Sequence, residues 1–121
     1  MIDQKKEIIS SDDNLLRRVL FMNPSFIKPD GTISSACFKL KKNEVGLSVD
    51  IERLTDYAVS IQDRRKFRLY SINAGFAQSL SLETTHNPLP DNTAHALING
   101  KITKSVSRKL AVSAIRIAYP D

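Results

Sequence analysis

Both histidines of the chain lie in one stretch, HNPLPDNTAHALING, residues 86–100, together with two of the five prolines. Imidazole serves in acid–base catalysis, metal binding and hydrogen bonding near neutral pH. The nine-residue spacing of His86 and His95, with no cysteine nearby, fits no metal-ligand motif, so no metal site is predicted. Two interpretations of His95 stay open. It contacts a ligand at a strand end beside Asp91, or it hydrogen-bonds a turn carbonyl and fixes the loop, which the turn residues Pro88 and Pro90 favour.

The basic side chains indicate a different chemistry, the binding of an anion. Residues 1–63 carry nine Lys or Arg and ten Asp or Glu, whereas residues 64–121 carry nine and three. Clustered cations raise the local potential and attract phosphates. Two clusters, in segments 63–68 and 101–109, could form one patch, or they could be ordinary solvated faces. The residues predicted to bind nucleic acid or another polyanion are Arg64, Arg65, Lys66, Arg68, Lys101, Lys104, Arg108 and Lys109.

The sequence NGKIT, residues 99–103, invites comparison with the phosphate-binding loop. That motif needs a glycine five residues before its Gly-Lys pair, and His95 holds that place here, so the motif does not match. A weaker expectation survives. Free amides at the start of the helix expected next, with Lys101 and Lys104 close by, could hold a phosphate.

The elements that must position these residues alternate between two periodicities. Short apolar or alternating runs predict strands over 46–51, 67–72, 94–100 and 114–120, and 33–40 could add a further short strand. The apolar run over 15–21 fits a strand or a short helix, and we favour the strand. Helical spacing predicts helices over 51–61 with Asp50 as N-cap, over 74–82 with Asn73 as N-cap, and from a cap within 99–103 to Val112. We expect an α+β (or two-layer α/β) fold with a mixed sheet of about five strands, parallel pairs included, and about three helices packed mainly on one face.

Length and composition bound the organisation of the chain. The 121 residues suit one globular domain, expected over 15–121, after a flexible polar arm over 1–14. The single cysteine, Cys37, excludes an internal disulfide and is expected in the core. We find neither a signal peptide nor an apolar run of membrane-spanning length, so a cytoplasmic protein is expected.

Six segments taken in order resemble a small, uncharacterised family of prokaryotic proteins over about residues 15–118. They are RRVLF, DGTISSACF, GLSVD, INAGFAQSL, NPLPDNTAHALING and KSVSRKLA. No activity accompanies this resemblance.

A second resemblance is to NAD-handling ADP-ribosyltransferase-like domains, which often carry an arginine on a first strand and a serine on the next. Arg17 or Arg18 and Ser34 or Ser35 match those positions, and Glu83 is the nominal counterpart of the late catalytic glutamate. The resemblance implies a nucleotide-like ligand in a crevice. The residues that would meet there are Arg17, Arg18, Ser34, Ser35, Asp91 and His95.

The favoured hypothesis is a small non-enzymatic binding module without a cofactor, which engages an anionic partner, foremost nucleic acid, through the basic C-terminal half. One alternative is the NAD- or nucleotide-handling enzyme. Another is a protein–protein interaction subunit or homodimer that pairs through the terminal strand, since an edge strand presents free amides and carbonyls.

Overall fold

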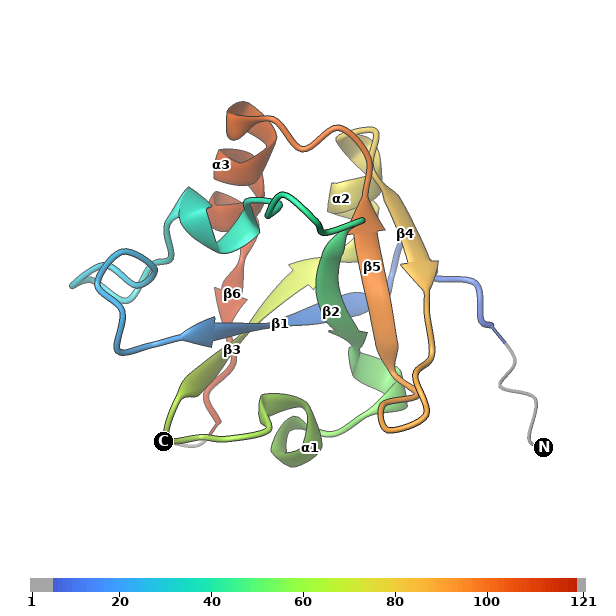
Figure 1. Ribbon diagram of the computed structural model, residues 1–121, viewed down its shortest axis with the longest axis horizontal. Coiled ribbons are helices and arrows are strands. Elements are labelled where there is room, and N and C mark those ends of the chain that lie inside the picture. Colours follow the sequence, from blue (N-terminus) through green and yellow to red (C-terminus); the bar gives the residue numbers. More distant parts are fainter. Residues whose placement is uncertain (1–5, 120–121) are drawn as a thin grey trace.

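The computed structural model describes residues 6–119. Figure 1 shows a strongly bent sheet with helices on both faces. The strands are β1 (Asn14–Leu20), β2 (Leu47–Ile51), β3 (Phe67–Asn73), β4 (Glu83–His86), β5 (His95–Asn99) and β6 (Ile115–Arg116). The helices are α1 (Tyr57–Ile61), α2 (Ala74–Ser79) and α3 (Lys104–Ser113), with two short 3₁₀ helices, η1 (Ser35–Phe38) and η2 (Glu52–Leu54).

The six strands form one sheet in the order β4-β5-β2-β1-β3-β6. The predicted α+β class is confirmed, with six strands within residues 6–119 where about five were expected. The expected mixed sheet with parallel pairs is wrong, because every strand pair is antiparallel. The helices do not serve as crossovers between neighbouring parallel strands.

The middle of the sheet is where it bends. β1 pairs with β3 along its whole length, from Asn14 to Leu20, but it pairs with β2 only at Leu15 and Leu16. Beyond Leu16 the two strands diverge, and Figure 1 shows β1 crossing the direction of β2 and β5 steeply. Residues 17–20 of β1 therefore have a strand partner on one side only.

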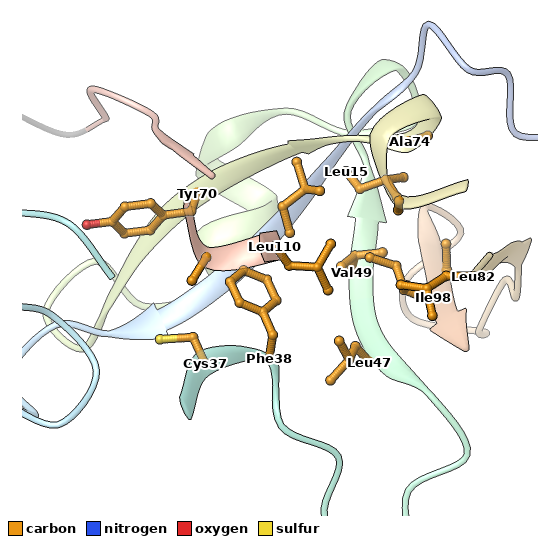
Figure 2. Close-up of a cluster of buried hydrophobic side chains, with 14 of the residues drawn as sticks. Leu15, Cys37, Phe38, Leu47, Val49, Tyr70, Ala74, Leu82, Ile98 and Leu110 are labelled. Atoms are coloured by element: carbon orange, nitrogen blue, oxygen red, sulfur yellow. The ribbon is translucent and has the colours of Figure 1, made fainter. Parts of the chain in front are cut away.

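Strand alternation sends apolar side chains to both faces of the sheet. One face builds the main core with α2, α3 and η1, as Figure 2 shows for Phe38, Val49 and Leu110. The other face carries a smaller cluster around Leu16 and Leu69, which α1 covers. Two of the three α-helices thus lie on the main-core face and α1 lies on the other.

Several predicted elements are confirmed. Strands occur at β1, β2, β3 and β5 close to their expected bounds. The side chain of Asn73 caps α2 by accepting from Phe76 N, and the side chain of Thr103 caps α3 by accepting from Val106 N. These caps satisfy amides that a helix start leaves free.

One predicted element is wrong and two are shorter than predicted. Segment 33–40 is not a strand but contains η1, which buries Cys37 and Phe38 together, whereas a strand would send consecutive side chains to opposite faces. The helix expected over 51–61 is reduced to η2 and the short α1, because Asp56 rather than Asp50 is the N-cap. The final strand, expected over 114–120, pairs only at β6, and residue 120 lies outside the described part.

Residues before β1 contact the domain. The predicted flexible arm covers 1–14, of which residues 1–5 lie outside the described part of the chain. Ile9 is buried in the main core, and Asp13 accepts a hydrogen bond from Arg53 Nε at 2.7 Å. Gly75 N donates to Ser11 O at 3.1 Å, and a Cβ on this glycine would lie 2.8 Å from that oxygen, so the close approach requires glycine. The core therefore includes residues that precede Leu15.

Candidate functional site

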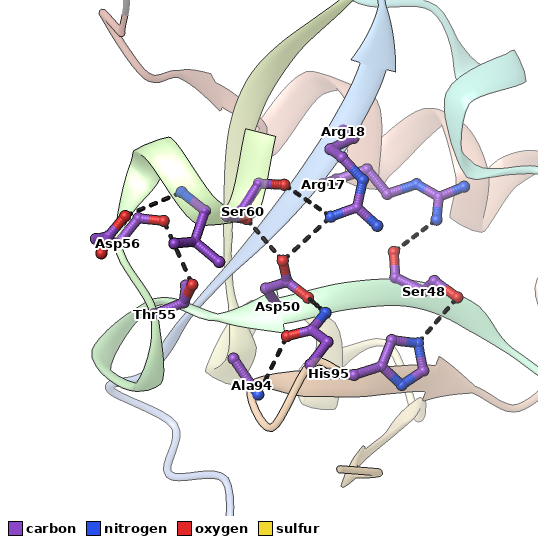
Figure 3. Close-up of polar contacts among 11 residues, drawn as sticks. Arg17, Arg18, Ser48, Asp50, Thr55, Asp56, Ser60, Ala94 and His95 are labelled. Carbon is purple, nitrogen blue, oxygen red and sulfur yellow. Dashed lines mark hydrogen bonds and ion pairs between the residues drawn. The ribbon is translucent and has the colours of Figure 1, made fainter. Parts of the chain in front are cut away.

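Arg17 lies where β1 leaves β2. Its Nη1 donates to Ser48 O at 2.7 Å, and its Nε donates to Cys37 O at 3.0 Å. The Ser48 carbonyl is on the β2 edge that β1 no longer covers, so the guanidinium takes the place of a strand partner (Figure 3). Its Cζ also lies 5.9 Å from the centre of the Phe38 ring, within the range of a cation–π contact. Packing against η1 and β2 thus fixes the orientation of this side chain.

A cavity of about 180 Å³ opens at this divergence, and we name it the β1 cavity. Its walls come from the second half of β1, from the segment after η1, and from the start of β3. The lining residues are Arg17, Arg18, Val19, Leu20, Phe26, Ala36, Cys37, Lys39, Lys41, Glu44 and Phe67. Four cations and one carboxylate therefore share the walls of a single small cavity.

Backbone groups of β1 are also uncovered on the edge of this strand that faces away from β3. Odd-numbered residues direct their amides and carbonyls to β3, as the bond from Phe21 N to Lys66 O shows, and even-numbered residues direct theirs the other way. Leu16 uses these groups with β2, but Arg18 lies beyond the end of that pairing. An amide on an uncovered strand edge is a hydrogen-bond donor available to an anion.

The charges of the β1 cavity are unequally compensated. Arg18 pairs with Asp50, Nη1 to Oδ2 at 3.1 Å, whereas within residues 6–119 no carboxylate forms an ion pair with Arg17. Burial lowers the pKa of Arg17, an effect that the nearby Glu44 carboxylate opposes, yet a guanidinium stays protonated near neutral pH. Glu44 itself accepts from Lys41 N at 2.8 Å within its own turn. The cavity therefore holds more positive than negative charge.

A second cavity, of about 370 Å³, adjoins the first, and we name it the α3 cavity. Ala36 and Lys39 line both cavities, so only the segment around η1 separates them. Its remaining lining residues are Ser35, Ile102, Lys104 and Ser107. Ser107 Oγ donates to Phe38 O at 2.8 Å, which ties α3 to the end of η1. Lys39 and Lys104 are the cations of this cavity, and both are exposed.

Asp50 is the centre of a buried polar network that includes Arg18. Only 1% of this residue is exposed. Its carboxylate accepts from Arg18 and from Ser60 Oγ at 2.7 Å, as Figure 3 shows, and also from Asn92 Nδ2 at 2.8 Å. Arg18 Nη1 donates in addition to Ser60 O at 2.8 Å. The network joins β1, β2, α1 and the loop before β5, so its geometry indicates a structural role.

Both histidines are buried and bonded within the protein. His95 Nδ1 lies 3.0 Å from Asn87 O and Nε2 lies 3.2 Å from Ser48 Oγ, so a neutral ring donates to the carbonyl and accepts from the hydroxyl. His86 Nε2 similarly lies 2.7 Å from Thr93 O. Of the two interpretations of His95, this geometry matches the one in which the ring fixes the loop.

The two predicted basic clusters do not adjoin. Figure 1 shows α3 at one end of the molecule and the loop from α1 to β3 at the other. Arg68 stacks on the Phe21 ring, with Cζ 3.9 Å from its centre, and donates to Arg64 O at 2.7 Å. These contacts stabilise the turn that precedes β3. Arg65 lies 3.3 Å from the Asp63 carboxylate. Arg64, Lys66, Lys101, Arg108 and Lys109 are exposed, and of all eight predicted residues only Lys104 lines either named cavity.

The residues of the enzyme interpretation meet only in part. Arg17 and His95 both contact Ser48, through its carbonyl and its hydroxyl respectively. Ser34 Oγ donates instead to Ser25 O, and Asp91 is exposed at the turn between β4 and β5.

The remaining members are separated as well. Ser35 lines the α3 cavity, Arg18 lines the β1 cavity, and Glu83 is exposed on β4 at the far edge of the sheet. The described residues therefore do not form one crevice from this set.

Cys37 is packed as a core residue. Burial raises the pKa of its thiol, and Sγ lies 3.5 Å from Phe26 O. A thiol held protonated is a poor nucleophile. Within residues 6–119, no group of three or more His, Cys, Asp or Glu side chains is arranged to hold a metal ion.

Sequence reasoning missed Lys39 and Lys41. They stand in KLKK, residues 39–42, a basic run directly after the apolar ACF, and its charge density was the one available signal. Nothing in the sequence places this run opposite Arg17, because that depends on the divergence of β1 from β2.

Comparisons of the chain with protein-family models, with curated proteins and with solved structures found no match. Among the helices of residues 6–119, none combines the length and apolar character needed to cross a membrane.

Proposed function

We propose that this protein is a cytoplasmic binding module for an anionic partner, with nucleic acid as the partner and the β1 cavity as the centre of the site. The observation that carries the proposal is the partial burial of Arg17 together with its hydrogen-bond partners. Arg17 is a partly buried cation whose described hydrogen bonds go to carbonyl groups and not to a carboxylate. Glu44 lies near Arg17 but makes no direct ion pair with it, so the charge is incompletely compensated and an entering phosphate would supply a directly bonded anion.

The groups around Arg17 favour a phosphate over an uncharged ligand. Lys39 and Lys41 are exposed and line the same cavity from the segment after η1. The uncovered amide of Arg18 adds a neutral donor on the adjacent strand edge. Cations combined with backbone amides are the groups that proteins use to hold phosphate oxygens.

The experiment is a fluorescence-anisotropy titration of labelled single-stranded DNA and RNA at several salt concentrations. Each neutralised phosphate contributes about −0.7 to the slope of log affinity against log salt for a single strand. Arg17, Lys39 and Lys41 form no ion pair with a carboxylate in the described part of the chain, so these three cations predict a slope of about −2.

The matched variants are a Lys39→Ala/Lys41→Ala double substitution and a Lys28→Ala/Lys42→Ala double substitution. Both remove two exposed lysines, but Lys28 and Lys42 line neither named cavity. The first pair should weaken binding at least tenfold and flatten the salt slope by more than about one. Absence of binding by the unmodified protein at low salt, or equal losses in the two variants, would remove the proposal.

A further inference from the structure

We infer that the nucleic acid bound at this site is single-stranded and passes over η1 from the β1 cavity into the α3 cavity. This inference rests on the proposed function and names the form of its ligand. It depends on three features of the two cavities: their depth, their contiguity and the side chains between them.

Depth separates a single strand from a duplex. Arg17 is partly buried in the wall of the β1 cavity, which measures only about 180 Å³. A duplex is stiff over about 150 base pairs and presents its phosphates on a convex surface, so it meets cations that project from a protein. A single strand can turn one phosphate into a small recess. Arg17 is therefore accessible to a single strand or to a small free phosphate.

Contiguity separates a strand from a small free phosphate. The α3 cavity shares Ala36 and Lys39 with the β1 cavity and has about twice its volume. Lys104 offers it a second positive charge. A ligand with successive phosphates would occupy both cavities at once, whereas a single phosphate would fill only one.

The remaining lining groups suit the other parts of a nucleotide. Phe26 and Phe67 line the β1 cavity, and aromatic rings beside a cationic path provide stacking surfaces for bases. In the α3 cavity the apolar Ile102 and the hydroxyl of Ser35 lie beside Lys104. Apolar surface next to a hydroxyl can receive a base or a sugar.

The test compares Lys104→Ala with Lys101→Ala. Both lysines are exposed and lie three residues apart before or at the start of α3, but only Lys104 lines the α3 cavity. The probes are oligothymidylates without terminal phosphates, from the dinucleotide to the octanucleotide, and a blunt duplex of the same length as the longest. Thermal unfolding of both variants checks that the fold is retained.

We expect the octanucleotide to bind more tightly than both the dinucleotide and the duplex. Lys104→Ala should reduce its affinity about tenfold, which corresponds to the loss of one charge-assisted contact, and should leave dinucleotide binding nearly unchanged. Lys101→Ala should have little effect on either. Equal or tighter binding of the duplex, or equal effects of the two variants, would overturn the inference while the proposed function stands. No binding of any probe would overturn both.

Discussion

Replacement of Asp50 by alanine is the most informative perturbation of the fold, because one buried carboxylate receives donors from three separate elements. The substitution leaves Arg18, Ser60 Oγ and Asn92 Nδ2 without their acceptor. Removing one partner of a buried ion pair costs about 3–5 kcal/mol, and a buried hydroxyl left unsatisfied costs a further ~1–3 kcal/mol. These costs overlap, because Arg18 keeps its bond to Ser60 O and 19% of its side chain is exposed.

We therefore expect Asp50→Ala to lower the free energy of unfolding by about 3–5 kcal/mol, a large share of the typical 5–15 kcal/mol. The assay is urea denaturation followed by circular dichroism, with a thermal midpoint expected to fall by roughly 10–20 °C. Asp50→Asn should also destabilise, because its amide nitrogen would face a donor group. Arg65→Ala is the control, since the pair of Arg65 with Asp63 is exposed, and it should leave the midpoint unchanged. A loss under 1 kcal/mol for Asp50→Ala would refute the reasoning.

Two further predictions concern the loops. His95→Ala should lower the free energy of unfolding, measured by urea denaturation, by about 1–3 kcal/mol, because Asn87 O and Ser48 Oγ lose their partner. The affinity for the oligonucleotide should stay unchanged. Lost affinity with unchanged stability would instead mean that His95 contacts the ligand. Burial raises the pKa of Asp13, but hydrogen bonds from Arg53 and from a backbone amide outweigh it and hold that pKa below its usual 3.8. A lowered folded pKa stabilises above the unfolded value, so this contribution is lost as the pH falls from about 4 through the lowered pKa. The rate of amide hydrogen exchange in residues 6–13 of the unmodified protein should therefore rise in this pH range. Asp13→Asn should show fast exchange in these residues at all pH values.

The sequence predicts those elements whose local pattern agrees with their tertiary surroundings. β3 is rich in β-forming residues in FRLYSI and buries side chains on both of its faces, and the Asn73 cap follows that run directly. β4 was missed because ETTH is polar and stands at the sheet edge, where backbone pairing with β5 rather than side-chain burial holds it. η1 was mistaken for a strand because an apolar run does not decide its own period.

The candidate site was less predictable than the fold. Linear charge density indicated segments 63–68 and 101–109, but the fold places the first at the loop from α1 to β3 and the second at the start of α3, at opposite ends of the molecule in Figure 1. Arg17, Lys39 and Lys41 meet because β1 leaves β2 after Leu16. That divergence is a property of the whole sheet, which no local pattern encodes.

The most direct test of the proposed site is a two-dimensional ¹H–¹⁵N NMR titration of the unmodified protein with an oligothymidylate at low salt. The account predicts that the perturbed amides gather around the two cavities, in residues 17–20, 36–41 and 102–107, with Arg18 among the largest shifts. It also predicts that the exposed cluster at residues 64–66 stays nearly unshifted. Perturbations centred on residues 64–66, or shifts absent throughout the described part of the chain, would contradict the account.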